Sequence, residues 1–240
     1  MNNNIAEINR CNQRGSRMLS IIDLIERNTI GLQTASYLAY RIHNGASFIT
    51  GAVPGGAGKT TVMGALLNLI PCGMEIIPCE DTPEVDRVKQ SKDSVCALAH
   101  EISPGPYYCY VWGDLLRRFF ALGRYGHLLA ANLHADNLPQ AEEQICGENT
   151  VPESDFRSID FFVFLSASGG FMDKTVTVSH IMRFDCESGV YKELTPDFTE
   201  HLYREYSGFE TLFSRLIRKK TYTIEDVRKH IERECYECAK

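Results

Sequence analysis

The chain has 240 residues, of which 44% are hydrophobic and 23% are charged, close to average globular usage. This composition excludes wholesale disorder, collagen-like repeats and a coiled coil, and the length suits one sizeable α/β core plus a small appendage, or two modest domains. Lys and Arg number 25 against 31 Asp and Glu, a formal net charge of −6, which argues against the wrapping of nucleic acid as the main role.

Nine cysteines are spread from Cys11 to Cys238. No run reaches the roughly 18–20 apolar residues of a membrane helix, and Met1–Asn4 is polar where a signal peptide would begin. We therefore expect reduced, mostly buried thiols in a cytosolic protein. Cys235 and Cys238 form a single CxxC pair, which is weak evidence for zinc beside the simpler interpretation of a helix end or tail.

The first predicted elements are helical. Apolar residues at helical spacing predict one helix within 16–27 and a second over Leu32–His43. A short strand over Ser47–Thr50 then opens onto a glycine-rich turn, and a helix follows over Thr61–Leu69 until Pro71 stops it. A strand, a glycine-rich turn and a helix in this order are the local context of a phosphate-binding loop.

The later elements continue the alternation of strands and helices. The predicted strands are Met74–Pro78, Tyr107–Trp112, Leu128–Leu133 and Ile159–Leu165, and helices are predicted over Leu115–Leu122 and near Pro139–Ile145. The alternating run Lys174–Arg183 and the turn after it predict a β-hairpin, and from Phe198 onward the chain is helical and charged. This order predicts a mostly parallel sheet covered by helices on both faces, with the hairpin at one edge.

The strongest chemical signal is Gly58-Lys59-Thr60, the end of a Walker A phosphate-binding loop. In such a loop, backbone N–H groups surround the phosphates, the lysine reaches the β- and γ-phosphates, and the threonine hydroxyl ligates Mg²⁺. The predicted nucleotide-binding residues are Gly55, Gly56, Ala57, Gly58, Lys59, Thr60 and Thr61. The usual spacing puts the first glycine at Val53, so this loop is either two residues longer or lacks that glycine.

Carboxylates follow two of the predicted strands. Enzymes with a Walker A loop need an acidic residue on a second strand to hold Mg²⁺ and a carboxylate to orient water. Glu80, Asp81 and Glu84 follow the strand that ends at Pro78, and Asp114 follows the third predicted strand. Such positions point into the crevice where open α/β sheets bind ligands, although an N-cap of the next helix is the alternative for each of them.

Two histidines flank the fourth predicted strand. His127 precedes it and His134 follows it. A histidine at a strand end beside a phosphate site can sense the γ-phosphate or couple it to a neighbouring subunit. Both histidines are therefore predicted site residues, with a purely structural role as the alternative for each.

Taken in order and spacing, these motifs resemble the secretion and pilus ATPases of the type II/type IV secretion superfamily, particularly the archaeal-type branch. The resemblance covers about residues 16–234. It implies a RecA-like P-loop core that hydrolyses ATP with Mg²⁺ at the subunit interfaces of a hexameric ring. It also implies a cytoplasmic location at the inner face of the cell membrane, where such a ring works with a membrane platform protein on pilins, secreted protein or DNA.

The resemblance also implies roles for single residues. Glu80, Asp81 and Glu84 match its acidic "Asp box", and His127 and His134 match its "His box". Lys59 and Thr60 bind phosphates and Mg²⁺, and Asp114 takes the place of the Walker B glutamate as a further Mg²⁺ ligand.

Several features depart from that family. Asp114 is one methylene shorter than the family's glutamate, and Asn132 stands where the family has Thr or Ser. The resemblance includes no counterpart of the family's large N-terminal domain, so we expect a motor core without it. Because the Walker A loop is also stretched, we expect slow ATP hydrolysis or none.

Three segments and two alternative functions complete the prediction. A helical lead-in is predicted over 1–44, the ATPase core over 45–196 and a small C-terminal helical subdomain over 197–240. One alternative is a nucleotide-binding regulator of such a motor that does not hydrolyse ATP. The other is a small-molecule or nucleotide kinase, whose P-loop is similar but whose arginine-rich lid is matched only by Arg157 within 140–158.

Overall fold

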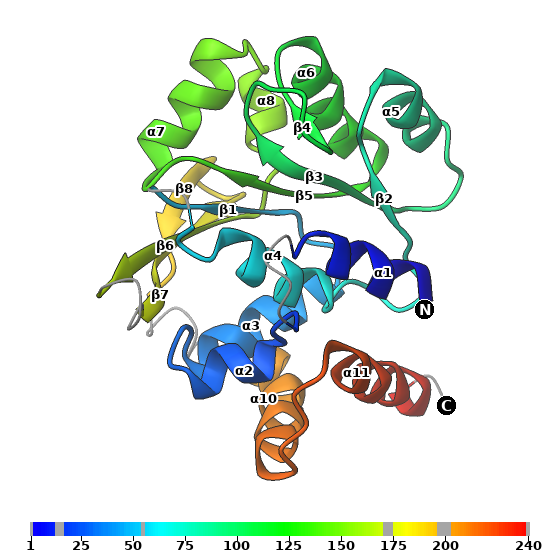
Figure 1. The fold of residues 1–240 in the computed structure, drawn as a ribbon, viewed down its shortest axis with the longest axis vertical. Coiled ribbons are helices and arrows are strands. Elements are labelled where there is room, and N and C mark those ends of the chain that lie inside the picture. The colour runs from blue at the N-terminus through cyan, green and yellow to red at the C-terminus, as the bar shows by residue number, and fades with distance from the viewer. Residues whose placement is uncertain (1, 13–16, 54–55, 170–174, 196–202, 239–240) are drawn as a thin grey trace.

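A computed structural model describes residues 2–12, 17–53, 56–169, 175–195 and 203–238, in which a sheet lies between two layers of helices (Figure 1). The eight strands are β1 (Phe48–Gly51), β2 (Ile76–Pro78), β3 (Cys96–Ile102), β4 (Tyr110–Val111), β5 (Leu128–Leu133), β6 (Phe161–Ser168), β7 (Thr175–Asp185) and β8 (Val190–Glu193). Their order is β2-β3-β5-β1-β6-β7-β8, with β4 paired to β3. The pairs among β1 to β6 are parallel, and β7 and β8 add an antiparallel hairpin at one edge. The mostly parallel α/β fold predicted from the sequence is confirmed.

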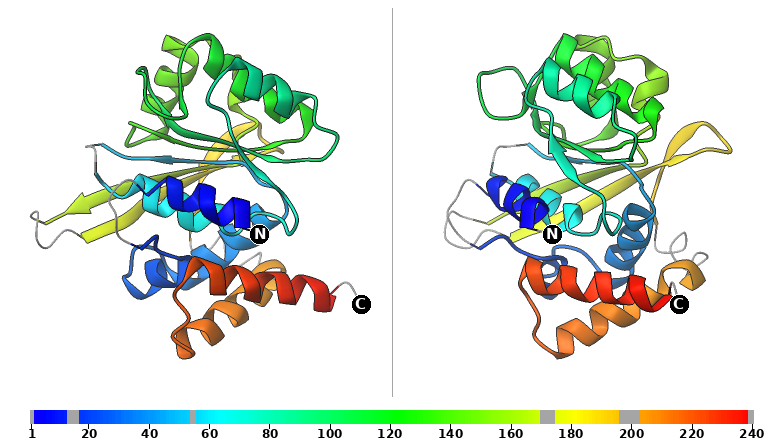
Figure 2. Two further views of the ribbon diagram at one scale, coloured as in Figure 1. Left: turned by 45° about the vertical axis from the view of Figure 1, so that its right-hand side comes forward. Right: turned by 90° about the vertical axis from the view of Figure 1, so that its right-hand side faces the viewer.

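Helices cover both faces of this sheet (Figures 1 and 2). One face carries α5 (Thr82–Lys89), α6 (Asp114–Ala121), α7 (Leu138–Glu142) and α8 (Glu153–Phe156), with a 3-10 turn over Leu122–Tyr125 and a π-helical turn over Glu143–Glu148. The other face carries α1 (Asn2–Arg10), α2 (Ile21–Glu26), α3 (Leu32–His43) and α4 (Lys59–Leu67), and beyond them lie α10 (Tyr203–Arg218) and α11 (Ile224–Cys238). None of the helices within the described ranges is long and apolar enough to cross a membrane.

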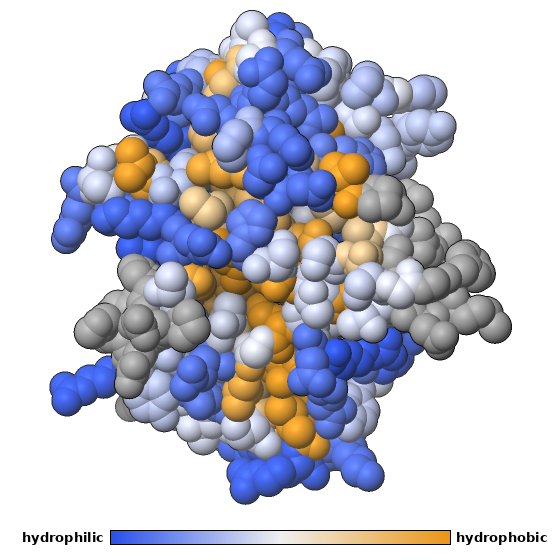
Figure 3. Space-filling view, turned by 90° about the vertical axis from the view of Figure 1, so that its left-hand side faces the viewer, coloured by the Kyte–Doolittle hydropathy of each residue, from blue (hydrophilic) through white to orange (hydrophobic). Residues whose placement is uncertain are grey.

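Two buried clusters, one on each side of the sheet, hold the layers together. Successive strand side chains point to opposite faces, so Phe48 joins the cluster beneath α3 and α4 while Ile49 joins the cluster beneath α5 to α8. Figure 3 views the side on which β6 to β8 and α2 lie. There, hydrophobic residues gather in the middle and lower half of the molecule and hydrophilic ones dominate the upper end.

Most predicted elements match the structure, and one strand assignment is wrong. The strand next to β5 is β3, Cys96–Ile102, which the sequence analysis did not predict. The predicted strand Tyr107–Trp112 is reduced to the two residues of β4. Tyr107 is 67% exposed and Cys109 has a φ of +53°, so this aromatic run forms a turn before the short strand.

The helix predicted within 16–27 is also shorter than expected. It begins at Ile21, because Ser20 and Asp23 form a reciprocal capping box that fixes its first turn. The next predicted helix, Leu32–His43, has the same bounds in the structure.

Side chains from before and after the predicted core join the sheet in one cluster. Ile8 of α1 and Phe213 of α10 belong to the same cluster as Phe48 of β1. The ring of Tyr37 in α3 meets those of Phe161 and Tyr206 edge-on, with centroids 6.0 and 5.9 Å away. The boundaries of the three predicted segments stay a prediction, but their packing is continuous.

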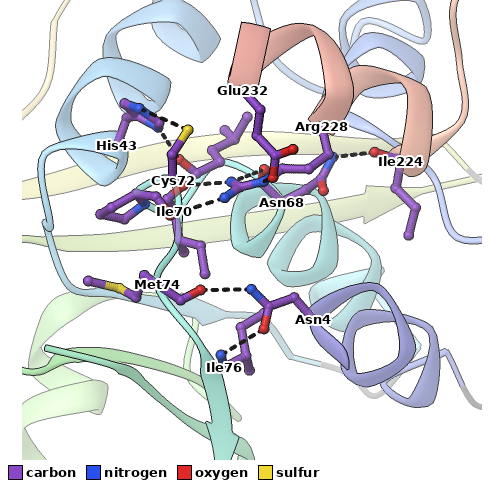
Figure 4. A network of polar contacts seen from close by, with 12 residues as sticks. Asn4, His43, Asn68, Ile70, Cys72, Met74, Ile76, Ile224, Arg228 and Glu232 are labelled. Carbon is purple, nitrogen blue, oxygen red and sulfur yellow. Dashed lines mark hydrogen bonds and ion pairs between the residues drawn. The ribbon is translucent and has the colours of Figure 1, made fainter. Parts of the chain in front are cut away.

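The C-terminal helix α11 is joined to helix α4 by a buried arginine (Figure 4). Arg228 is 6% exposed, and its guanidinium donates to the carbonyls of Asn68, Ile70 and Pro71 at 3.2, 2.6 and 3.0 Å. These carbonyls lie just beyond the last turn of α4, where the helix dipole favours a cation. Glu232 pairs with the same guanidinium at 3.0 Å, so the buried charge is balanced.

We predict that Arg228→Met lowers the free energy of unfolding by about 2–4 kcal/mol, measured by urea denaturation. The substitution keeps an aliphatic stem and leaves three carbonyls and Glu232 without their donor. Arg218→Ala is the matched control, because Arg218 is exposed on the same tail and forms no ion pair with a described side chain. It should change stability by less than about 0.5 kcal/mol, and equal losses in both variants would contradict the role of Arg228.

Candidate functional site

Strand β1 ends in the middle of the sheet, between β5 and β6, and the glycine-rich loop leaves from there. The end of β1 is crowded: a Cβ on Gly51 would lie 2.6 Å from the carbonyl oxygen of Ala135, so only glycine fits. Below it, the Thr50 hydroxyl donates to Asn132 Oδ1, and Asn132 Nδ2 donates to the carbonyl of His100 at 2.8 Å. This buried chain of hydrogen bonds ties β1, β5 and β3 together directly under the loop.

The loop itself is held at both ends. Near its start, the N–H of Val53 donates to Asp136 Oδ1 at 2.6 Å, which ties the loop to the segment after β5. At its end, Gly58 has a φ of +91°, a left-handed conformation that favours glycine, and helix α4 begins at Lys59. The first backbone N–H groups of α4 therefore face the loop, which is the arrangement that binds anions at helix N-termini.

A buried lysine lies between a carboxylate and an imidazole at the end of this loop. Lys59 Nζ is 3.6 Å from Glu101 Oε1, 3.2 Å from His134 Nδ1 and 3.5 Å from the carbonyl of Ala52. Lys59 is 6% exposed and Glu101 is 7% exposed. His134 Nε2 lies 3.7 Å from the same Glu101 oxygen, so the three side chains form one compact group.

The electrostatics of this group follow from its burial. Burial lowers the pKa of Lys59, and the charge of Glu101 opposes that effect. Burial raises the pKa of Glu101, and Lys59 opposes that effect in turn. Burial and the Lys59 charge together lower the pKa of His134, which favours its neutral form. An ammonium can only donate, so Nδ1 of His134 accepts from Lys59 and its proton lies on Nε2, facing Glu101.

Two clefts adjoin the loop and share Gly56, Gly58 and Thr61. The first has a volume of about 260 Å³, and Lys59, Thr60, Glu101 and His134 line it together with Cys11 and Asn12, which follow the first helix. The second has a volume of about 450 Å³ and is lined by Leu19, Leu24, Arg27, Thr29, Val62, Thr175 and Val176. The first cleft is polar and close to the lysine, and the second offers more apolar surface.

The first cleft also contains oxygen donors that suit Mg²⁺. The Oε1 atom of Glu101 is buried without a hydrogen-bond partner, and Thr60 lines the same cleft. Magnesium is commonly held by one or two carboxylates and phosphate oxygens rather than by a full set of protein ligands. The described residues contain no group of three His, Cys, Asp or Glu that could hold a metal alone. Thr60 thus fits a Mg²⁺ that arrives with a phosphate ligand, and the Glu101 carboxylate lies in the same cleft.

The structure brings together one subset of the predicted site residues. Gly56, Gly58, Lys59, Thr60, Thr61 and His134 line the first cleft. Ala57 is buried within the loop, and Gly55 lies outside the described residues. The remaining predicted residues lie elsewhere.

Glu80, Asp81 and Glu84 lie at the same edge of the sheet but not in the cleft. They follow β2, which β3 and β5 separate from β1, a distance of about 14 Å at the usual strand spacing. Asp81 caps α5 by accepting from the N–H of Glu84 at 3.0 Å, and Glu84 pairs with Arg87 at 2.9 Å. The N-cap interpretation therefore describes what Asp81 does in this structure.

The structure does not place Asp114 beside Lys59, which corrects its assignment to the Walker B position. Asp114 is 64% exposed on the first turn of α6 and pairs with Arg118 at 2.6 Å and Arg117 at 3.4 Å. The hydrogen bond from Arg118 lowers its pKa. Asp114 does not line the cleft that contains Lys59. Its strand was misplaced because β4, rather than a long central strand, precedes it.

His127 and His134 lie at opposite ends of strand β5. The six residues of β5 separate them, which is about 20 Å along an extended strand. His127 is 5% exposed and its Nδ1 accepts from the N–H of Val95 at 3.3 Å. Burial lowers the pKa of His127. Its placement fits a structural role that joins β5 to the start of β3.

Sequence reasoning missed Glu101, the carboxylate that contacts Lys59. The signal was present: the apolar run Val95–Ala99 is strand-sized and ends in His100-Glu101. The structure thus places Glu101, rather than Asp114, beside Lys59.

His100, the neighbour of Glu101, is also enclosed. Its Nε2 is 3.2 Å from the Sγ atom of Cys11, and its ring meets that of Tyr108 edge-on with centroids 4.9 Å apart. Burial, aided by the charge of Arg10, lowers the pKa of His100 to about 4.

No protein-family model and no curated protein matches the chain. Among solved structures, it is similar to the VirB11 ATPase of the Brucella suis type IV secretion system, with 17% identity and a TM-score of 0.45 over 66% of this chain and 55% of that one. It is similar to the ATPase DotB of Legionella pneumophila, with 11% identity and a TM-score of 0.42 over 73% of this chain and 53% of that one. It is also similar to the ATPase DotB of Yersinia pseudotuberculosis, with 10% identity and a TM-score of 0.47 over 82% of this chain and 55% of that one.

The chain thus spans about half the length of the solved structures that it matches. All three TM-scores are below 0.5, and the function proposed below rests on the site itself.

We predict that His100 makes the fold sensitive to acid. Its pKa is near 6.5 in the unfolded chain and about 4 in the fold, so between these values the unfolded chain binds a proton that the fold does not. Stability therefore falls as the pH drops from about 6.5 to about 4. In urea denaturation, His100→Gln should reduce the loss of unfolding free energy between pH 7 and pH 4.5 by about 2 kcal/mol.

The other histidines are unchanged in this variant and act as the internal reference. An identical loss of stability in the wild-type protein and His100→Gln over the same pH range would contradict the prediction.

Proposed function

We propose that the protein is an ATP-binding and ATP-hydrolysing motor subunit of a type II/type IV secretion or pilus-assembly system. The observation that carries the proposal is the group formed by the buried Lys59 and Glu101 with the more exposed His134 at the end of a glycine-rich loop. This group stands where a strand leads into a helix N-terminus in a mostly parallel sheet. Ligands of open α/β sheets bind at this edge.

The two clefts suit the two halves of a nucleotide. The N-terminus of α4, the loop N–H groups and Lys59 supply positive potential for the phosphates in the first cleft. The second cleft, with Leu24, Val62 and Val176 among its residues, offers an apolar surface for a base and its sugar. Because the clefts meet at Gly56, Gly58 and Thr61, one nucleotide can occupy both.

Phosphate binding changes the partners of Lys59. In the structure its ammonium faces Glu101, and a γ-phosphate would attract that ammonium and release the carboxylate. Glu101 would then be available to accept a proton from an attacking water, for which its burial-raised pKa makes it a better base. His134, with its proton on Nε2, can donate toward the phosphate or the water. Thr60 and the phosphates would hold Mg²⁺, which would supply positive charge against the phosphate oxygens.

The finer parts of the proposal rest on the order of the sequence motifs. They are a hexameric ring, a cytoplasmic location at the inner face of the membrane, a membrane platform protein as partner, and pilin, secreted protein or DNA as cargo. The roles of Glu80 and Glu84 also belong here, because a residue that lies outside the cleft of its own chain can act at a subunit interface.

A regulator that binds nucleotide without hydrolysing it is the second candidate. The observation in its favour is the loop, which has six residues between Gly51 and Gly58 and Val53 in place of the usual first glycine. A longer loop can still bind phosphates while it places the γ-phosphate away from Glu101.

We predict that Lys59→Ala weakens the binding of MgATP roughly 10- to 100-fold, because a charge-assisted contact is lost. Glu101→Gln should keep binding and reduce steady-state hydrolysis about 100-fold or more, because the base is removed. The measurements are calorimetric or fluorescence binding and a phosphate-release assay.

Asp114→Asn is the control that separates Glu101 from the sequence-based assignment. It should leave hydrolysis near the wild-type level, since Asp114 is exposed and outside the cleft. A loss of hydrolysis with Asp114→Asn and none with Glu101→Gln would overturn the assignment. Binding without turnover in the wild-type ring or monomer would favour the regulator, and absence of binding would overturn both.

A further inference from the structure

Helix α1 is fastened to the ATPase core by contacts at both of its ends. Near its start, the Asn4 side chain donates to the carbonyl of Met74 at 2.8 Å and accepts from the N–H of Ile76 at 2.9 Å, beside β2 (Figure 4). In its middle, Ile8 is 1% exposed and joins the cluster beneath α4. A nine-residue helix is marginal in isolation, so these contacts decide whether α1 stays in place.

The last turn of α1 contacts the segment between β3 and β4. Arg10 donates to the Tyr108 hydroxyl at 2.7 Å, and its guanidinium lies 5.1 Å from the centre of the Tyr108 ring. The same hydroxyl donates to Glu7 at 3.3 Å. One residue later, Cys11 is fully buried, and its thiol contacts the ring of His100. Tyr108 in turn packs edge-on against His100, so the contacts close into one cluster.

This cluster is joined to the candidate nucleotide site in two ways. Cys11 and Asn12 are part of the wall of the cleft that contains Lys59, Thr60 and Glu101. His100 immediately precedes Glu101 on β3, so a shift of its ring moves the backbone that carries the proposed base. Tyr110 from β4 lines the same cleft. The cleft is therefore incomplete without α1 in its docked position.

We propose that Arg10 and Tyr108 are positioning residues of the nucleotide site, which dock the last turn of α1 so that Cys11 and Asn12, which follow it, form a wall of the phosphate cleft. The inference rests on the proposed function, since the cleft is taken to bind nucleotide. Neither side chain needs to touch the nucleotide. Their hydrogen bond determines how often Cys11 and Asn12 close the cleft, and hence how tightly a nucleotide is held.

The cysteines of the chain provide a direct readout of this docking. Cys11 is buried under α1, Cys72 and Cys186 are exposed, and Cys96 is buried within the sheet. Alkylation by iodoacetamide can be followed for each cysteine peptide by mass spectrometry. Cys11 then reports on the docking of α1, Cys72 and Cys186 are exposed references, and Cys96 reports on global unfolding. Burial raises the pKa of the Cys11 thiol to about 12, which keeps it unreactive while α1 is docked.

The test uses the full chain with Arg10→Ala, Tyr108→Phe and the conservative variant Arg10→Lys. Tyr108→Phe removes the hydroxyl and keeps the ring beside His100. Both disruptive variants should raise the alkylation rate of Cys11 and weaken the binding of ADP and of a non-hydrolysable ATP analogue, each by about three- to tenfold. If ATP is hydrolysed, the KM should rise with little change in kcat. Arg10→Lys should retain most of the wild-type behaviour.

Arg157→Ala is the matched control, because Arg157 also pairs with a glutamate on an exposed surface, away from the cleft. It should leave both measurements unchanged. In the wild-type protein, bound nucleotide should slow the alkylation of Cys11 and leave Cys72 unaffected, which tests the docking without any substitution.

The outcomes separate this inference from the proposed function. If the wild-type protein binds no more nucleotide than Lys59→Ala, the proposed function fails and this inference fails with it. If the wild-type protein binds nucleotide but does not protect Cys11, or if the disruptive variants expose Cys11 without loss of affinity, the inference alone is overturned. A rise in Cys96 alkylation that parallels Cys11 would also overturn it, because the effect would then be unfolding rather than undocking.

Discussion

A buried cation at the end of a glycine-rich loop is the constraint on which the rest of the site depends. Lys59 is almost wholly inside the protein, where an unpaired ammonium would be costly. Glu101 and His134 come from the ends of β3 and β5, and they can meet Lys59 only because these parallel strands end at one edge. The group of Lys59, Glu101 and His134 therefore requires this sheet order, which also places the start of helix α4.

The polar residues beneath the loop stabilise the same arrangement from below. Thr50, Asn132 and the carbonyl of His100 link three neighbouring strands in a fully buried environment. A buried amide is tolerated because both of its functional groups are used. The Asn132 side chain is long enough to link β1 to β3 through β5.

The sequence predicted the fold well where local signals agree and failed where they conflict. The segment from β1 to α4 combines glycines, a lysine and helical periodicity, and the structure has the predicted order of strand, loop and helix there. The strand that carries Glu101 was missed because Ala97 and Ala99 have weak strand propensity and His100 and Glu101 are polar. Tertiary burial between β2 and β5 overrides that propensity.

Tyr107, Tyr108 and Tyr110 have strong strand propensity, yet a turn with a left-handed Cys109 uses their rings for local contacts. Which side chains pair, such as Arg118 with Asp114, depends on distances in the folded structure that the sequence does not give.

Helix α4 is held at both ends by segments outside the sheet, and this gives the chain two routes by which its ends can act on the loop. At the N-terminal end, Cys11 and Asn12, which follow α1, form part of the cleft that Lys59 and Thr60 line. At the C-terminal end, Arg228 of α11 binds the carbonyls that follow the last turn. A shift of α11 would therefore act on the end of α4, and a shift of α1 would act on the cleft beside its start. Segments from both ends of the described chain thus contact the surroundings of the helix that begins with Lys59.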